Sequence, residues 1–149
     1  MTDKVYDFLT APKRTASKIK AKRWLREEKL SGMMPGAIRY DVPRVQSSPA
    51  DRMSQASAEV DIIEREIEQL KNDLREQRRE IADTAGSLEC KDGTEVIIRR
   101  YIDGLQWKDV ARAMHKSQST VFRIHREAVD ELDHILPDNP QIVDDSVDK

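Results

Sequence analysis

The fold of this chain is decided by residues 94–136, whose sequence is TEVIIRRYIDGLQWKDVARAMHKSQSTVFRIHREAVDELDHIL. Apolar residues recur there at helical spacing in three runs, which are separated first by Gly104 and then by His115 and Lys116. The apolar positions are Ile97, Ile98, Tyr101, Ile102 and Leu105, then Trp107, Val110, Ala111 and Met114, then Val121, Ile124, Ala128, Leu132 and Ile135. Ser117 can cap the last run, because its hydroxyl can accept from a free backbone N–H of the helix that follows. The pattern predicts three short helices that end in a helix-turn-helix.

The last of these helices has a polar face opposite its apolar one. The residues on this face are Gln118, Ser119, Phe122, Arg123 and Arg126. Such side chains can contact base edges and phosphates when the helix lies in a major groove. The face therefore indicates a surface that binds double-stranded DNA.

Residues 99–132, RRYIDGLQWKDVARAMHKSQSTVFRIHREAVDEL, resemble region 4 of bacterial sigma-70-type factors, the domain that reads the promoter −35 element. The resemblance rests on an Arg-Tyr pair and a Gly ahead of Trp107, on the Lys-Asp-Val-Ala step that follows, and on a Ser-x-x-Thr-Val turn. Where that family has Gly and an apolar residue in the turn, this chain has His115 and Lys116. Gly adopts the left-handed backbone conformation without steric cost, whereas His only tolerates it.

The resemblance implies which residues meet DNA. Base contacts are expected from Gln118, Phe122 and Arg123. Phosphate contacts are expected from Ser117, Ser119 and Thr120. Apart from the resemblance, positive charge alone predicts further phosphate contacts from Arg126, Lys116, Arg112, Lys108, Arg99 and Arg100. Three alternatives stay open: Phe122 as a packing residue, Arg123 as a solvated one, and ion pairs for some of the cations.

A second periodic pattern covers residues 51–84. Met53, Val60, Ile67, Leu74 and Ile81 recur every seven residues, and Ala56, Ile63, Leu70, Gln77 and Thr84 fill the other seam position. This heptad spacing predicts one long helix that must bury its apolar seam. The residues expected to drive oligomerisation are Met53, Val60, Ile63, Ile67, Leu70, Leu74 and Ile81. A parallel dimeric coiled coil and an antiparallel pairing with the N-terminal helix are both possible, and two such hairpins could form a four-helix bundle.

The remaining segments complete an all-α organisation. Residues 1–32 predict a basic helix, interrupted near its start by Pro12, that either covers a neighbouring helix or contacts nucleic acid. Residues 33–50 contain four prolines or glycines and predict a linker. Residues 85–93 are expected to form a hinge before the helix-turn-helix domain at 94–136, and the acidic tail at 137–149 is expected to be disordered.

Composition narrows the class of protein. The 149 residues include 36% charged side chains and a net charge of −2, but residues 11–32 carry a net +6 and residues 99–126 a net +5. A single cysteine fits a reducing cytoplasm, and neither a signal peptide nor a membrane span is expected. No catalytic constellation, metal-ligand spacing or phosphate-binding loop is present in the sequence, so we expect neither an enzyme nor a cofactor.

The segments AIRYD and VQSSPADRM, followed by the heptad helix and the region 4-like end, are similar to small phage and prophage proteins near the ArpU/RinA-type late transcriptional regulators. This resemblance implies a transcriptional regulator in a bacterial host cell. The alternatives are a phage DNA-packaging or assembly protein and an interaction module that docks on RNA polymerase. A homo-oligomer is expected in each case, and no membrane contact.

Overall fold

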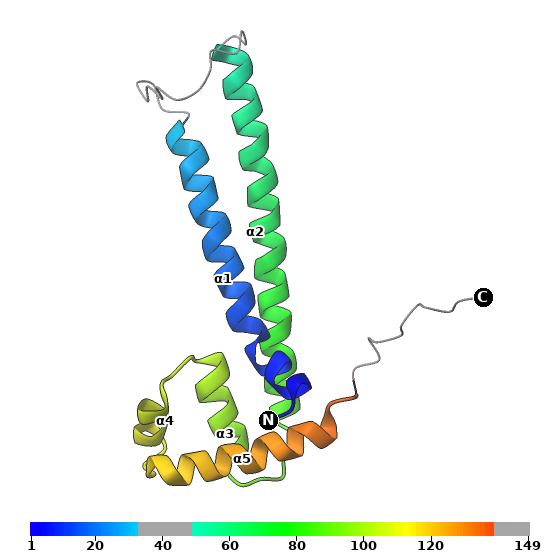
Figure 1. Cartoon of the computed structure of the whole chain (residues 1–149), viewed down its shortest axis with the longest axis vertical. Coiled ribbons are helices and arrows are strands. Elements are labelled where there is room, and N and C mark those ends of the chain that lie inside the picture. Colours follow the sequence, from blue (N-terminus) through cyan, green and yellow to red (C-terminus); the bar gives the residue numbers. More distant parts are fainter. Residues whose placement is uncertain (33–48, 139–149) are drawn as a thin grey trace, which may run out of the picture. The chain divides into compact units, whose positions relative to one another are not determined.

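The computed structural model describes residues 1–32 and 49–138, and every regular element within them is helical. The elements are α1 (Asp3–Gly32), α2 (Pro49–Ala85), α3 (Gly93–Ile97), the π-helical turn η1 (Ile98–Ile102), α4 (Trp107–Ala113) and α5 (Gln118–Ile135) (Figure 1). The all-α prediction is confirmed. The predicted linker at 33–50 and the predicted tail at 137–149 lie almost entirely outside the described residues.

The chain divides into two compact units. One consists of Met1–Lys13 and Glu76–Lys149, and the other is Arg14–Arg75. Both divisions fall inside the long helices α1 and α2. Each unit therefore takes part of both long helices.

The unit Arg14–Arg75 is an antiparallel helical hairpin with an apolar centre. Ile19 of α1 packs against Ile63 and Ile67 of α2, and these three side chains are 4–5% exposed. Leu70 and Leu74 are partly buried against the same cluster. The heptad seam is therefore buried within the chain along this stretch.

Two ion pairs join the helices of the hairpin, and we call them the hairpin ion pairs. Lys22 Nζ lies 2.5 Å from a carboxylate oxygen of Glu66, and Lys29 Nζ lies 2.5 Å from one of Glu59. Residue numbers rise along α1 as they fall along α2, so the two helices are antiparallel. Of the two pairings left open by the sequence, the antiparallel one occurs within the chain.

Pro12 does not interrupt α1, contrary to the sequence prediction. The helix continues from Asp3 to Gly32 with Pro12 inside it, and the Pro12 ring is buried. A proline costs a helix one backbone donor and a steric clash, but burial of its ring offsets part of that cost. The division between the two units follows directly afterwards, at Lys13.

The other unit has two apolar clusters that meet along α5. The first contains Val5, Leu9, Ile81, Ala85, Ile97, Ala128, Val129 and Leu132. The second contains Val96, Val110, Ala111, Met114, Val121 and Ile124. The start of α1 and the end of α2 thus belong to the same core as the helix-turn-helix.

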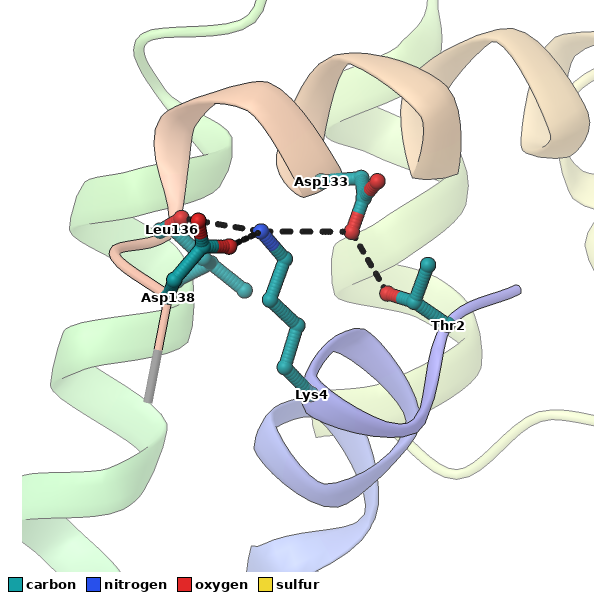
Figure 2. A network of polar contacts seen from close by, with 5 residues as sticks. All are labelled: Thr2, Lys4, Asp133, Leu136 and Asp138. Carbon is teal, nitrogen blue, oxygen red and sulfur yellow. Dashed lines mark hydrogen bonds and ion pairs between the residues drawn. The ribbon is translucent and has the colours of Figure 1, made fainter. Parts of the chain in front are cut away.

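Polar contacts hold the N-terminus of the chain to the end of α5 (Figure 2). The Thr2 hydroxyl donates to Asp133 at 2.5 Å, and Lys4 Nζ lies 2.8 Å from Asp138 and 3.3 Å from the Leu136 carbonyl oxygen. The hydrogen bond to Asp138 raises the pKa of Lys4, and the one from Thr2 lowers the pKa of Asp133. These contacts lie at the edge of the apolar cluster that contains Val5.

Candidate nucleic-acid interface

The turn between α4 and α5 has the geometry that the sequence predicted. His115 has φ 54°, in the left-handed region. Its backbone N–H donates to the Arg112 carbonyl, and the Lys116 N–H donates to the Ala111 carbonyl at 3.0 Å. This pair of bonds is the Schellman motif, which ends a helix with a left-handed residue that is usually Gly. His115 therefore forms the tight turn at a steric cost.

Ser117 caps α5. Its backbone is extended, with ψ 155°, and its hydroxyl accepts from the Thr120 backbone N–H at 3.2 Å. The same hydroxyl lies 2.8 Å from the Thr120 hydroxyl and 3.3 Å from that of Ser119. The hydroxyls of Ser117 and Thr120 are thus engaged with each other in the first turn of α5, while Ser119 is exposed.

The N-terminal half of α5 presents the predicted base-reading residues on its exposed side. Gln118 and Arg123 are exposed, and Phe122 is 42% exposed. Phe122 also packs on Trp107, with 5.1 Å between the ring centroids, so its ring is partly covered and partly exposed. The opposite side of the helix is buried through Val121 and Ile124.

The predicted phosphate-binding cations differ in their local contacts. Lys116 lies 3.3 Å from Asp92, and Arg100 donates to the Leu105 carbonyl while lying 4.9 Å from the Trp107 ring centroid. Ion pairs also join Arg99 to Glu95, Arg112 to Asp109 and Arg123 to Glu127. In the described part of the chain, the side chains of Lys108, Arg126 and Gln118 make no hydrogen bond or ion pair.

An aromatic cluster lies beneath this surface, and the sequence pattern did not predict it. His125 Nε2 lies 2.8 Å from the Tyr101 hydroxyl, and the His125 ring meets Trp107 edge-on with 4.7 Å between centroids. Burial, with a smaller effect from the Arg100 guanidinium, lowers the pKa of His125 to about 4. His125 is therefore neutral at physiological pH and acts as a packing residue. The only sequence signal was its spacing from Phe122 and Val121, which places it at the edge of the buried face.

Cys90 is not activated as a nucleophile. Burial, with a further effect from the Glu127 carboxylate, raises the pKa of its thiol to about 11. The Cys90 Sγ lies 3.4 Å from Glu127 and 3.8 Å from the Ile124 carbonyl oxygen. Within residues 1–32 and 49–138, no group of three or more His, Cys, Asp or Glu side chains is arranged to hold a metal ion.

The residues predicted to drive oligomerisation lie in different surroundings. Val60, Ile63 and Ile67 are buried in the hairpin unit, and Ile81 is buried in the core beneath the helix-turn-helix. Leu70 and Leu74 are partly buried, and Met53 is 55% exposed. Most of the seam is thus covered by residues of the same chain.

The class defined by these features is an all-helical protein that combines a helical hairpin with a helix-turn-helix unit. The chain belongs to the family described as Protein of unknown function (DUF1492), whose model matches residues 43–133. No curated protein and no solved structure matches the chain. None of the helices described in residues 1–32 and 49–138 is both long and apolar enough to cross a membrane.

Proposed function

We propose that this protein is a sequence-specific DNA-binding transcriptional regulator of phage or mobile-element genes, which acts as a homo-oligomer in the cytoplasm of a bacterial host. The observation that carries the proposal is the exposed group of Gln118, Phe122, Arg123 and Arg126 on the helix that follows the tight turn. In helix-turn-helix proteins this part of the second helix enters the major groove.

Arg123 and Gln118 suit direct base recognition. The planar guanidinium of Arg can donate two hydrogen bonds to guanine, and the amide of Gln can both donate to and accept from adenine. The ion pair of Arg123 with Glu127 does not prevent this, because both side chains are more than half exposed. Exposed pairs one helical turn apart contribute only about 0.3–0.5 kcal/mol, so a base can replace the carboxylate.

Lys108 and Arg126 suit phosphate contacts. Both side chains are exposed, Arg126 on α5 and Lys108 in the first turn of α4. The backbone N–H groups at the start of α5 add a site of positive potential, since the first turn of a helix has donors without intrahelical partners. Cations of this kind set the affinity for DNA and its dependence on salt.

Selection of bound sites from a random DNA pool, followed by footprinting, tests the proposal. With the selected site, Arg123→Ala should cost about 1–3 kcal/mol in binding and relax the preference at one base position. Arg79→Ala is the matched control, because Arg79 lies on α2 with 76% of its side chain exposed and should leave binding unchanged. An equal loss on selected and random DNA would make Arg123 a phosphate contact.

Two other outcomes would replace the proposal. If the protein protects a DNA-packaging start and no promoter-proximal site, it is an assembly protein. If it fails to bind any DNA but retains RNA polymerase, it is a docking module.

A further inference from the structure

The hairpin unit Arg14–Arg75 has large apolar side chains at the surface of both of its helices. Trp24 is 64% exposed, Leu25 37% and Ile62 52%. Trp24 and Leu25 line a groove with Ala56 of α2. Isolated exposed apolar residues are common, but a cluster that joins two helices is typical of an interaction surface.

Helical spacing places Leu25 between the two hairpin ion pairs. Leu25 is three residues after Lys22 and four before Lys29, so these three side chains lie on one face of α1. Lys22 and Lys29 both reach α2 through their ammonium groups. Leu25 therefore projects from the same side of the hairpin on which the ion pairs lie.

Ile62 has the equivalent place on α2. It is three residues after Glu59 and four before Glu66, the two carboxylates of the hairpin ion pairs. Leu25 and Ile62 are thus at the same level along the hairpin. Leu25 and Ile62 both lie midway between the two hairpin ion pairs. These pairs are seven residues apart on each helix, or about 10 Å at a rise of 1.5 Å per residue.

The two helices of this unit differ in charge. Residues 14–32 of α1 carry seven basic side chains against two acidic ones, a net +5. Residues 49–75 of α2 carry four basic side chains against seven acidic ones, a net −3. The face therefore has a positive half along α1 and a negative half along α2.

We propose that this face is a dimer interface, and that its occupant is a second copy of the same chain related by a two-fold axis parallel to the hairpin helices. Rotation by 180° about such an axis puts α1 of one copy over α2 of the other. Basic helices then meet acidic ones on both sides of the axis. A two-fold axis perpendicular to the helices would put α1 over α1 and α2 over α2, so like charges would meet.

This arrangement matches apolar with apolar as well. A rotation about an axis parallel to the helices does not change the position of a residue along that axis. Leu25 of one copy therefore faces Ile62 of the partner subunit, and Ile62 of the first copy faces Leu25 of the partner subunit at the same level. The result is a four-helix bundle in which every neighbouring pair of helices is antiparallel. The apolar layer formed by Leu25 and Ile62 of both copies lies between the two levels of hairpin ion pairs along the bundle.

The heptad seam of α2 cannot form the dimer interface while the hairpin is intact. Ile63 and Ile67 are already 95% or more buried against α1, so a second copy could use them only if the hairpin opened. The interface that we propose leaves the hairpin intact. It also requires no DNA, so its test is separate from that of DNA binding.

Sedimentation velocity of the full chain across a wide range of concentrations tests the interface. Leu25→Lys and Ile62→Glu, each alone, should weaken dimerisation about 100-fold, because each would bury a charge against an apolar side chain. Ser57→Glu is the control: Ser57 is exposed and precedes Ile62 by five residues, which places it about 140° around α2 from Ile62, away from the proposed interface. It should leave the dimer unchanged, and circular dichroism should show native helicity for all three variants.

Mixing the Leu25→Lys and Ile62→Glu chains tests the direction of the axis. With the axis that we propose, Lys at position 25 faces Glu at position 62 of the other chain, so the mixture should recover a heterodimer at least 10-fold tighter than either variant alone. The absence of recovery would overturn the arrangement. A wild-type chain that stays monomeric at every concentration would overturn the interface itself. So would a loss of the dimer in Ser57→Glu equal to that in Ile62→Glu.

Discussion

The substitution Leu9→Ala tests whether the start of α1 is part of the fold that supports the helix-turn-helix. Leu9 is 1% exposed and belongs to the apolar cluster that includes Ile97 and Leu132. The change removes three carbon atoms, which costs about 2 kcal/mol of transfer free energy at about 0.8 kcal/mol per buried methylene. The cavity left behind raises the expected loss of unfolding free energy to about 3–4 kcal/mol.

The two tryptophans allow this loss to be assigned to one unit. Trp107 lies in the unit that contains Leu9, whereas Trp24 lies in the hairpin unit. In a Trp24→Phe background, fluorescence during urea unfolding reports on Trp107 alone. A loss of about 3 kcal/mol should lower the midpoint by about 2 M urea, if the slope is about 1.5 kcal/mol per M.

Tyr6→Ala is the control for this experiment. Tyr6 lies three residues before Leu9 on the same helix but is 56% exposed, so its removal should change the unfolding free energy by about 0.5 kcal/mol or less. If Leu9→Ala lowered the midpoint no more than Tyr6→Ala, the start of α1 would not belong to this core. Residues 94–136 would then be a self-sufficient unit, as their sequence pattern alone suggests.

His125 and His115 each affect the stability of the fold in a way that can be measured. The folded-state pKa of His125 is about 4, against an ordinary value of 6.5, so the unfolded chain binds more protons between these two pH values. The unfolding free energy should therefore fall by about 3 kcal/mol as the pH drops from 6.5 to 4. His125→Gln should flatten this pH dependence in unfolding followed by circular dichroism; equal slopes would assign it to another group. His115→Gly should raise the unfolding free energy by about 1 kcal/mol, because Gly adopts the left-handed backbone conformation without steric cost. Thermal unfolding measures this change, and a loss of stability would contradict this account of the turn.

The local geometry of residues 94–136 could be predicted because short-range rules determine it. The cap at Ser117 and the left-handed turn at His115 depend only on neighbours in sequence, and both occur as expected. The spacing of Val121, Ile124 and other apolar residues also identifies the buried face of α5. The same spacing failed at Ile135, which is 44% exposed, because periodicity identifies a face without showing where the neighbouring elements end.

Long-range partners could not be predicted in this way. An apolar stripe shows that a helix must be covered, but not by which segment. Nothing in the sequence around Val5 indicates that it shares a core with Leu132, which follows it by more than a hundred residues. The heptad seam of α2 has two partners for the same reason, α1 at Ile67 and the core beneath the helix-turn-helix at Ile81.

The predicted cations show why charge counts do not by themselves identify a DNA-binding surface. Arg100 and Lys116 have the same formal charge as Arg126, yet the first packs on Trp107 and the second is paired with Asp92. A cation that already has a partner must lose that contact to neutralise a phosphate, so its net contribution to binding is smaller. Arg126 has no such contact to lose within the described part of the chain. The surroundings of each side chain decide whether its charge is available to a ligand. Under the proposed function they favour the exposed side of α5 as the surface for DNA.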